Sequence, residues 1–141
     1  MKVLSKSEAE TKEIGFHLGK RLKPGQVVCL FGELGAGKTI FVKGLARALS
    51  IDEREVASAS FIIIAEHKEG KMPLYHVDLY RMAEGETDEL GLEEYFSGGG
   101  VTVIEWAERL GKDIPEDALK VTLSYREEDT LRDIEIQGMA W

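Results

Sequence analysis

A glycine-rich loop between an apolar run and a helical segment carries the clearest chemistry in the sequence. Residues 32–40 read GELGAGKTI and contain the pattern G-x-x-x-x-G-K-[ST], which ends at Thr39. Glycines let such a loop adopt positive φ and turn its N–H groups toward a phosphate, and the helix that follows adds the positive end of its dipole. In this pattern Lys38 brings a charge to the β- and γ-phosphates, and the Thr39 hydroxyl is a ligand for Mg²⁺. The predicted nucleotide contacts are Glu33, Leu34, Gly35, Ala36, Gly37, Lys38, Thr39 and Ile40.

Two acidic residues lie where hydrolysis of a bound nucleotide would need them. Glu105 ends the apolar run 101–105, where it would bind Mg²⁺ directly or through water, or orient the attacking water. Asp78 lies between two apolar residues on an expected strand, where an unpaired carboxylate would be unfavourable. Plainer interpretations are a solvated carboxylate for Glu105 and an ion pair with Arg81 for Asp78, and we expect His76 to be structural. The predicted catalytic residues are Lys38, Asp78 and Glu105, and the predicted metal ligands are Thr39, Asp78 and Glu105.

Expected strands and helices alternate around these residues. Ser7 and Glu10 have capping-box spacing, which predicts a helix over 8–22. Apolar runs predict strands at 26–31, 60–67, 72–80 and 101–105, and a closing hairpin over 118–137. Helical patterns lie at 39–49, at 85–96 with an interruption at Gly91, and as a short turn at 106–111. This alternation indicates an α/β domain with a mixed sheet.

The bulk composition limits the function classes. A length of 141 residues predicts a single domain spanning 1–141. The net charge of −8 and the scattered Lys and Arg disfavour direct, tight binding of nucleic acid, which would be reached through a partner. No apolar stretch approaches the roughly 20 residues of a membrane span and no signal-peptide core begins the chain, so we expect a cytoplasmic protein without membrane contact. The lone Cys29 is expected to be a packed core thiol.

Five segments together resemble one known family. The motifs GELGAGKT, SASF, YHVDLYR, LGLEEYF and VIEW follow one another along the chain. In their order and spacing the sequence resembles the TsaE (YjeE) family of small bacterial P-loop ATPases, which are required for the threonylcarbamoyl modification of adenosine 37 in tRNA. The resemblance extends from about Ser7 to Ile136, and HVDLYR combined with IEW is more specific than the loop alone. It implies a P-loop NTPase-type, three-layer α/β domain with a central mixed sheet that is mostly parallel and carries antiparallel hairpins.

The resemblance also implies an activity and partners. The ligands would be ATP and Mg²⁺, and the intrinsic ATP hydrolysis would be weak. The partners would be the TsaD and TsaB subunits of the transferase complex, which acts on tRNAs that read codons starting with A. ATP turnover by this chain would support or reset that complex without performing the transfer, so tRNA would be met only indirectly.

The family pattern assigns roles to further residues. Thr39, Asp78 and Glu105 match the family's metal and catalytic positions, and Lys38 matches its phosphate lysine. Trp106 matches a tryptophan that would position the site or meet a partner, with core packing as the alternative. Contacts to adenine are expected from Thr11 near the ring and from Arg132 in the last hairpin.

The sequence departs from the family pattern at two places. Ile40 stands where the family usually has a second threonine, which leaves Thr39 as the metal-binding hydroxyl. SASF stands where SPTF is usual, so Ala59 removes a proline and Ser60 keeps only the hydroxyl of threonine. The candidate switch or interface residues are Ser58, Ser60, Arg81 and Trp106. We assign no arginine finger, because an Asp78–Arg81 pair explains Arg81 equally well, and another subunit could supply the charge.

Two other functions use the same loop. A nucleotide-gated binding module would respond to ATP binding, and hydrolysis would be dispensable. A small-molecule kinase would need an arginine-bearing lid over its second substrate, and the acidic segment RMAEGETDELG at 81–91 is unsuited to that task.

Overall fold

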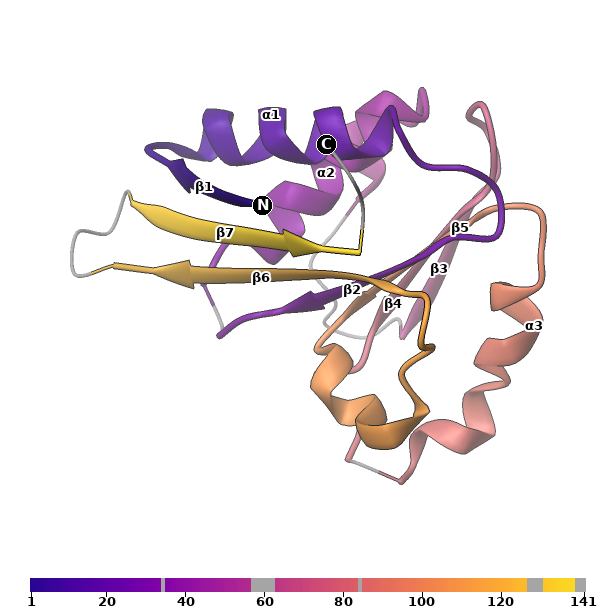
Figure 1. The fold of residues 1–141 in the computed structure, drawn as a ribbon. Coiled ribbons are helices and arrows are strands. Elements are labelled where there is room, and N and C mark those ends of the chain that lie inside the picture. The colour runs from indigo at the N-terminus through magenta and orange to yellow at the C-terminus, as the bar shows by residue number, and fades with distance from the viewer. Residues whose placement is uncertain (34, 57–62, 84, 127–130, 139–141) are drawn as a thin grey trace.

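One mixed β-sheet with the strand order β1-β7-β6-β2-β5-β4-β3 forms the centre of this computed structural model (Figure 1). The structure describes residues 1–33, 35–56, 63–83, 85–126 and 131–138. The strands are β1 (Lys2–Ser5), β2 (Val27–Phe31), β3 (Ile64–His67), β4 (Leu74–Asp78), β5 (Val101–Glu105), β6 (Leu119–Tyr125) and β7 (Arg132–Gln137). The helices are α1 (Glu8–Gly19), α2 (Lys38–Ala48) and α3 (Leu92–Phe96), with 3₁₀ segments at Glu53–Glu55, Thr87–Leu90 and Ala107–Asp113.

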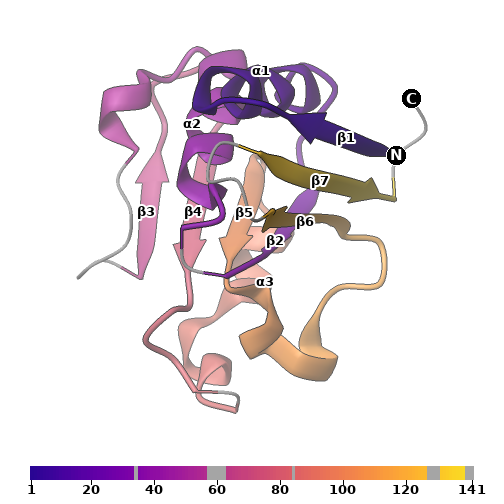
Figure 2. The same ribbon diagram turned by 90° about the vertical axis from the view of Figure 1, so that its left-hand side faces the viewer.

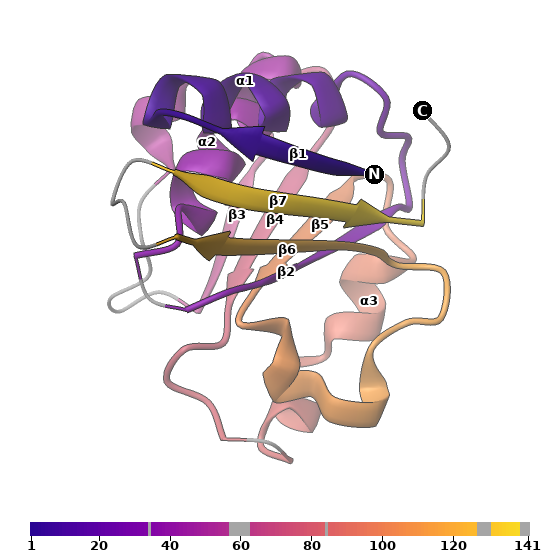
Figure 3. The ribbon, with the colours of Figure 1, turned by 60° about the vertical axis from the view of Figure 1, so that its left-hand side comes forward.

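Parallel pairing is confined to the four central strands. β2 lies between β5 and β6 and is parallel to both, and β4 is parallel to β5. The outer pairs β1–β7, β7–β6 and β4–β3 are antiparallel. Figure 3 shows β1, β7, β6 and β2 in succession, and Figure 2 shows β3, β4 and β5 side by side. The predicted mixed sheet with antiparallel hairpins is confirmed, but three of the six strand pairs that the structure describes are antiparallel, so the sheet is not mostly parallel as predicted. β1, which adds one of the antiparallel pairs, was not predicted.

Helices cover both faces of the sheet and make three layers (Figure 1). α1 and α2 lie on one face, and α3 with the 3₁₀ segments near it lies on the other. Alternate residues of β2 divide between the two cores: Val28 and Leu30 pack in the core with α1 and α2, and Val27 and Cys29 pack in the opposite core. A strand buried on both faces is apolar throughout, which explains why the run VVCLF shows no polar alternation.

Glycines allow α1 and α2 to approach closely. A Cβ atom at Gly15 would overlap the carbonyl oxygen of Phe41, and one at Gly44 would overlap the carbonyl oxygen of Lys12. Neither helix could hold its present distance with a larger residue at these positions. The backbone contact therefore fixes α2, and with it the glycine-rich loop that precedes α2.

The predicted start of α1 is confirmed, but its predicted end is too late. The Ser7 side chain accepts a hydrogen bond from the Glu10 N–H at 3.1 Å, as expected for a helix cap. The Glu10 carboxylate in turn accepts from the N–H of Lys6 at 3.1 Å. The helix ends at Gly19, residues 20 and 21 form a turn, and Leu22 after the turn still packs in the core.

The hairpins and the interrupted helix also agree with the sequence. β3 and β4 form one antiparallel hairpin, in which His67 and Leu74 are the pair next to the turn, and β6 and β7 form another. Gly91, at φ 65°, separates the 3₁₀ segment Thr87–Leu90 from α3. Among the helices that the structure describes, none has the length and apolar character needed to cross a bilayer.

Candidate functional site

The glycine-rich loop joins the central strand β2 to the start of α2. Gly37 is the N-cap residue of α2 at φ 100°, and no side chain of the described residues caps this end. The first turn of α2 also contains no acidic residue. The N–H groups at the start of α2 are therefore left to an external acceptor, and the positive end of the helix dipole is not neutralised by its own side chains.

The loop glycines play different structural parts. Gly32, at φ 150°, passes so close to β6 that a Cβ would overlap the carbonyl oxygen of Leu123. Gly35, at φ 85°, has open space where its Cβ would lie. Gly32 thus fixes the loop against the sheet, and Gly35 leaves open space beside the backbone, where a phosphate could approach.

Lys38 is buried and folds back over its own loop. Its Nζ donates hydrogen bonds to the carbonyl oxygen of Gly32 and, at 3.1 Å, to that of Glu33. Burial lowers the pKa of Lys38, and the nearby carboxylates, of which Glu105 acts most strongly, partly offset this effect. The ammonium group is thus held at the loop by weak neutral acceptors, which a phosphate would replace with a full negative charge.

Thr39, Glu105 and Asp78 come together at the end of the parallel strands. Thr39 Oγ1 donates a hydrogen bond to Glu105 Oε1 at 3.3 Å. Asp78 on β4 lies in register with Glu105 on β5, and both residues are buried. Asp78 Oδ1 accepts the N–H of Tyr80 at 2.9 Å, which orients its carboxylate just beyond the strand. Because Glu105 is buried, the predicted alternative of a solvated strand-end carboxylate is wrong.

His76 completes this group, and its contact with Glu105 was not predicted. His76 Nε2 hydrogen-bonds Glu105 Oε2 at 2.5 Å, and both side chains are almost fully buried. His76 lies two residues before Asp78, so both side chains project from the same face of β4. The spacing H-x-D on an expected strand was a signal that the two residues share a face.

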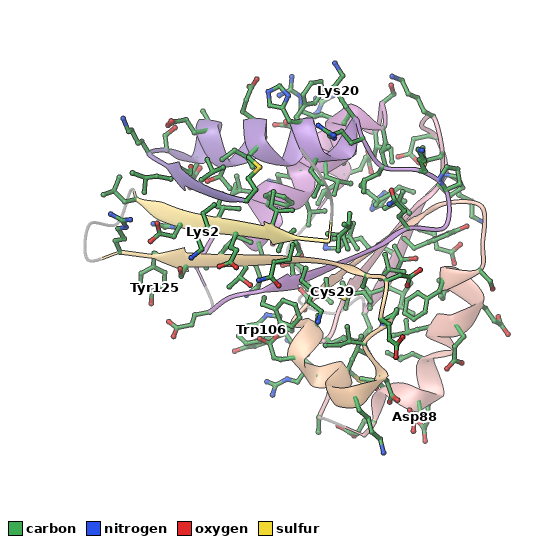
Figure 4. The ribbon with its side chains drawn as sticks, in the orientation of Figure 1. Lys2, Lys20, Cys29, Asp88, Trp106 and Tyr125 are labelled. Carbon is green, nitrogen blue, oxygen red and sulfur yellow. The ribbon has the colours of Figure 1, made fainter. Side chains whose placement is uncertain are left out.

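An aromatic cluster adjoins the lysine. Trp106 follows β5 in the left-handed conformation, at φ 59°, and its ring centroid lies 4.0 Å from Lys38 Nζ. The rings of Tyr80 and Trp106 pack edge to face, with their centroids 5.0 Å apart. The guanidinium carbon of Arg109 lies 5.7 Å from the centroid of the Trp106 ring. Figure 4 shows Trp106 on the side of the sheet away from α1 and α2. Trp106 is partly buried against the core opposite α1 and α2, which agrees with the core-packing alternative, and its role in positioning the site or meeting a partner stays a prediction.

The last hairpin and α1 reach the other side of the loop. Arg132 donates a hydrogen bond to the carbonyl oxygen of Gly35 at 3.3 Å. The Tyr125 hydroxyl, at the exposed end of β6 in Figure 4, donates to the Glu33 carboxylate at 3.2 Å. Thr11 hydrogen-bonds Ser5 at 2.7 Å, and its methyl group would lie 3.7 Å from a Cβ placed on Gly37. Thr11 and Arg132 therefore lie beside the loop, and their contacts to adenine stay a prediction.

The remaining predicted residues fall into two sets. Leu34, Ser58 and Ser60 lie outside the described residues, as does Ala59. Ile40 is half-buried in the first turn of α2, Ala36 is buried in the α1–α2 core, and Arg81 is exposed three residues after Asp78. Tyr125 and Arg109 were not predicted, because an exposed hairpin tyrosine and an arginine in a helical turn carry no distinctive spacing.

The donor set fits a phosphate with magnesium. Within the described ranges, no three His, Cys, Asp or Glu side chains are grouped so as to hold a metal on their own. Mg²⁺ usually binds proteins through one or two carboxylates and completes its shell with phosphate oxygens and water. The Thr39 hydroxyl beside the Glu105 carboxylate, next to an uncapped helix and an open glycine loop, suits that mode.

A central strand, a glycine-rich loop with the G-x-x-x-x-G-K-[ST] pattern and a helix, set in a three-layer α/β sheet, define the P-loop NTPase class of folds. Comparison with known proteins narrows this class. The family model described as "Threonylcarbamoyl adenosine biosynthesis protein TsaE" matches residues 5–134. The chain belongs to the TsaE family.

Relatives in several bacteria support this assignment. The tRNA threonylcarbamoyladenosine biosynthesis protein TsaE of Bacillus subtilis is 46% identical over 120 residues, which are 85% of this chain and 75% of the relative. The TsaE protein of Treponema pallidum is 43% identical over 124 residues, or 87% of this chain and 90% of the relative. The crystal structure of Bacillus subtilis YdiB superposes with a TM-score of 0.80 at 40% identity, covering 95% of this chain and 82% of that one.

Proposed function

We propose that this chain is a Mg²⁺-dependent ATPase of tRNA threonylcarbamoyladenosine biosynthesis, with low activity on its own. Membership of the TsaE family supports the place in tRNA modification. The observation that carries the ATPase proposal is the 3.3 Å hydrogen bond between Thr39 Oγ1 and Glu105 Oε1, beside the glycine-rich loop that Lys38 also contacts. A metal-binding hydroxyl, a carboxylate and a phosphate-binding lysine are the parts that phosphoryl transfer to water requires.

Each residue has a distinct part in this proposal. Lys38 exchanges its two carbonyl acceptors for phosphate oxygens, and the N–H groups at the start of α2 bind the same phosphates. When bound, Mg²⁺ would supply positive charge that offsets the negative charge of the phosphates. Thr39 and Asp78 would hold the metal through their oxygen atoms, and Glu105 would orient the attacking water and accept its proton.

The partners in this proposal are TsaD and TsaB, and tRNA is reached through them. The chain carries a net charge of −8, which opposes direct binding to the phosphate backbone of tRNA. ATP turnover then supports or resets the TsaD–TsaB complex, and this chain does not carry out the transfer. A cytoplasmic location accords with a function on tRNA.

The test is phosphate release from ATP by the purified chain, with Mg²⁺ or with EDTA, and then with TsaD, TsaB and unmodified tRNA added. We expect slow release by the chain alone, abolished by EDTA and stimulated by the complex. Lys38→Ala should abolish ATP binding, and Glu105→Gln should retain binding but lower turnover about 100-fold or more. Negligible hydrolysis under all of these conditions would exclude the ATPase proposal.

One observation favours a second candidate, the nucleotide-gated binding module. Lys38 contacts the Trp106 ring, so its movement onto a phosphate would change the packing of Trp106 with Tyr80 at the surface. ATP binding alone would then alter a partner-binding surface. If Glu105→Gln supports tRNA modification as well as the wild type does, this gating function is correct and hydrolysis is dispensable.

A further inference from the structure

The two oxygens of the Glu105 carboxylate have different partners. Oε1 accepts from the Thr39 hydroxyl at 3.3 Å, and Oε2 is bonded to the imidazole Nε2 of His76 at 2.5 Å. The Glu105 side chain is 3% exposed and that of His76 is 4% exposed, so water does not replace either partner. A carboxylate buried to this degree needs such hydrogen bonds to stay in place.

The strand register explains why position 76 reaches this oxygen. Asp78 of β4 is in register with Glu105 of β5. Two residues earlier on each strand, and on the same face of the sheet, His76 is in register with Val103. The neighbouring side chains on that face, Leu74 and Val103, are apolar and belong to the core under α1 and α2. His76 is therefore a polar side chain among apolar neighbours, and it contacts the Glu105 carboxylate from within the core.

We propose that His76 is a positioning residue for Glu105, in which the imidazole N–H holds Oε2 and keeps Oε1 directed toward Thr39 and the loop. A side chain held by one oxygen cannot rotate freely about its last torsion, so the other oxygen has a fixed direction. His76 does not touch the nucleotide in this arrangement, and it acts only through Glu105. The inference rests on the proposed ATPase function for its catalytic consequence, but the contact can be tested without it.

The kinetic test uses two substitutions of His76 in the full-length chain. His76→Gln retains an N–H donor near the position of Nε2, and His76→Leu removes it at similar volume. We expect His76→Leu to lower kcat for ATP roughly 10- to 100-fold with KM nearly unchanged, as is usual when a supporting hydrogen bond is lost. His76→Gln should recover most of the rate, and thermal melts would show that both variants fold.

A double-mutant cycle separates positioning from general damage. In a Glu105→Gln background, His76→Leu should change single-turnover hydrolysis by no more than about twofold, because the group that it positions is already lost. The control is His67→Leu, which alters another buried histidine on β3, outside the site, and should leave kcat at the wild-type level. Full additivity of His76→Leu and Glu105→Gln would overturn the proposal.

A measurement without nucleotide or metal keeps this inference distinct from the ATPase proposal. In ¹⁵N-histidine spectra of the free protein, His76 should show a slowly exchanging Nε2 proton, and that signal should be lost in Glu105→Ala. Its absence from the wild type would overturn the positioning contact even if the chain hydrolyses ATP. If the wild type hydrolyses no ATP but shows the proton, the ATPase proposal fails and the positioning contact stands.

Discussion

Thr39 Oγ1 donates a hydrogen bond to Glu105 Oε1 at 3.3 Å, although 66 residues separate the two in sequence. The contact follows from the sheet, because Leu30 of β2 is in register with Glu105 of the adjacent parallel strand β5. The loop after β2 and the carboxylate that ends β5 therefore meet at one edge of the sheet. Ligands of open α/β sheets bind at this edge, beyond the carboxyl ends of the strands.

The first prediction concerns the Thr39 hydroxyl. Thr39→Val keeps the shape of the side chain but removes the oxygen, so we expect the affinity for ATP in Mg²⁺ to fall by about tenfold or more. The affinity in EDTA should change little, because the loop N–H groups and Lys38 are intact. Isothermal titration calorimetry measures both, with Thr39→Ser as the matched control that restores the hydroxyl. Equal losses with and without Mg²⁺ would exclude a metal-binding role.

The second prediction concerns the contact between α1 and α2. Gly44→Ala places a methyl group against the carbonyl of Lys12, so the helices must separate, and we expect a loss of about 1–3 kcal/mol in the free energy of unfolding. Urea unfolding measures the change. Gly99→Ala is the control, because a Cβ there meets no atom within 4 Å, and its unfolding midpoint should stay near that of the wild type.

The third prediction is a pH dependence caused by Cys29. Burial raises the pKa of this thiol from 9.0 to about 12. As the pH rises, the thiol of the unfolded chain therefore loses its proton at a lower pH than the thiol of the folded chain. The free energy of unfolding should be unaffected by this group below pH 9.0 and should decrease as the pH rises from 9.0 toward 12. The contribution of one such group is up to about 1.4 kcal/mol per pH unit.

Chemical unfolding of wild type and Cys29→Ala at a series of alkaline pH values isolates this effect, since the other titrating groups are common to both. We expect the difference in their free energies of unfolding to shift in favour of Cys29→Ala as the pH rises above 9.0. The native thiol should also resist alkylating reagents until the protein unfolds. Parallel pH profiles, or rapid alkylation of the native state, would contradict the prediction.

The fourth prediction concerns the hydroxyl of Thr102 on β5. Thr102 is 1% exposed, and its Oγ1 has no hydrogen-bond partner in the described structure. Thr102→Val removes an unsatisfied polar atom at nearly constant volume, so we expect a gain of about 1 kcal/mol in the free energy of unfolding. Thermal or urea unfolding measures the gain, and Thr122→Val on β6 is a control at a more exposed strand position. A destabilised Thr102→Val would show that the hydroxyl is hydrogen-bonded in solution.

Local sequence patterns were sufficient to predict much of the fold. β2, the loop and α2 were predicted because each depends on short-range chemistry: an apolar run, glycines with positive φ and a helical period. The Ser7 cap and the break at Gly91 were predicted for the same reason. By contrast, β1 is four residues long with no marked pattern, and only its pairing with β7, from the other end of the chain, makes it a strand.

The amino-acid sequence alone indicated the candidate residues for the proposed chemistry: a glycine-rich loop ending in Lys38 and Thr39, one acidic residue at the end of an expected strand and another within one. The tertiary structure decided which atoms meet: one Glu105 oxygen with Thr39, the other with His76, and Arg132 with the Gly35 backbone. The physical reason is that the types and local spacing of residues set the properties of each segment, whereas the order and register of strands are settled by packing across the whole chain. The contact between Glu105 and His76 depends on the register between β4 and β5, and no spacing along the chain reports that register.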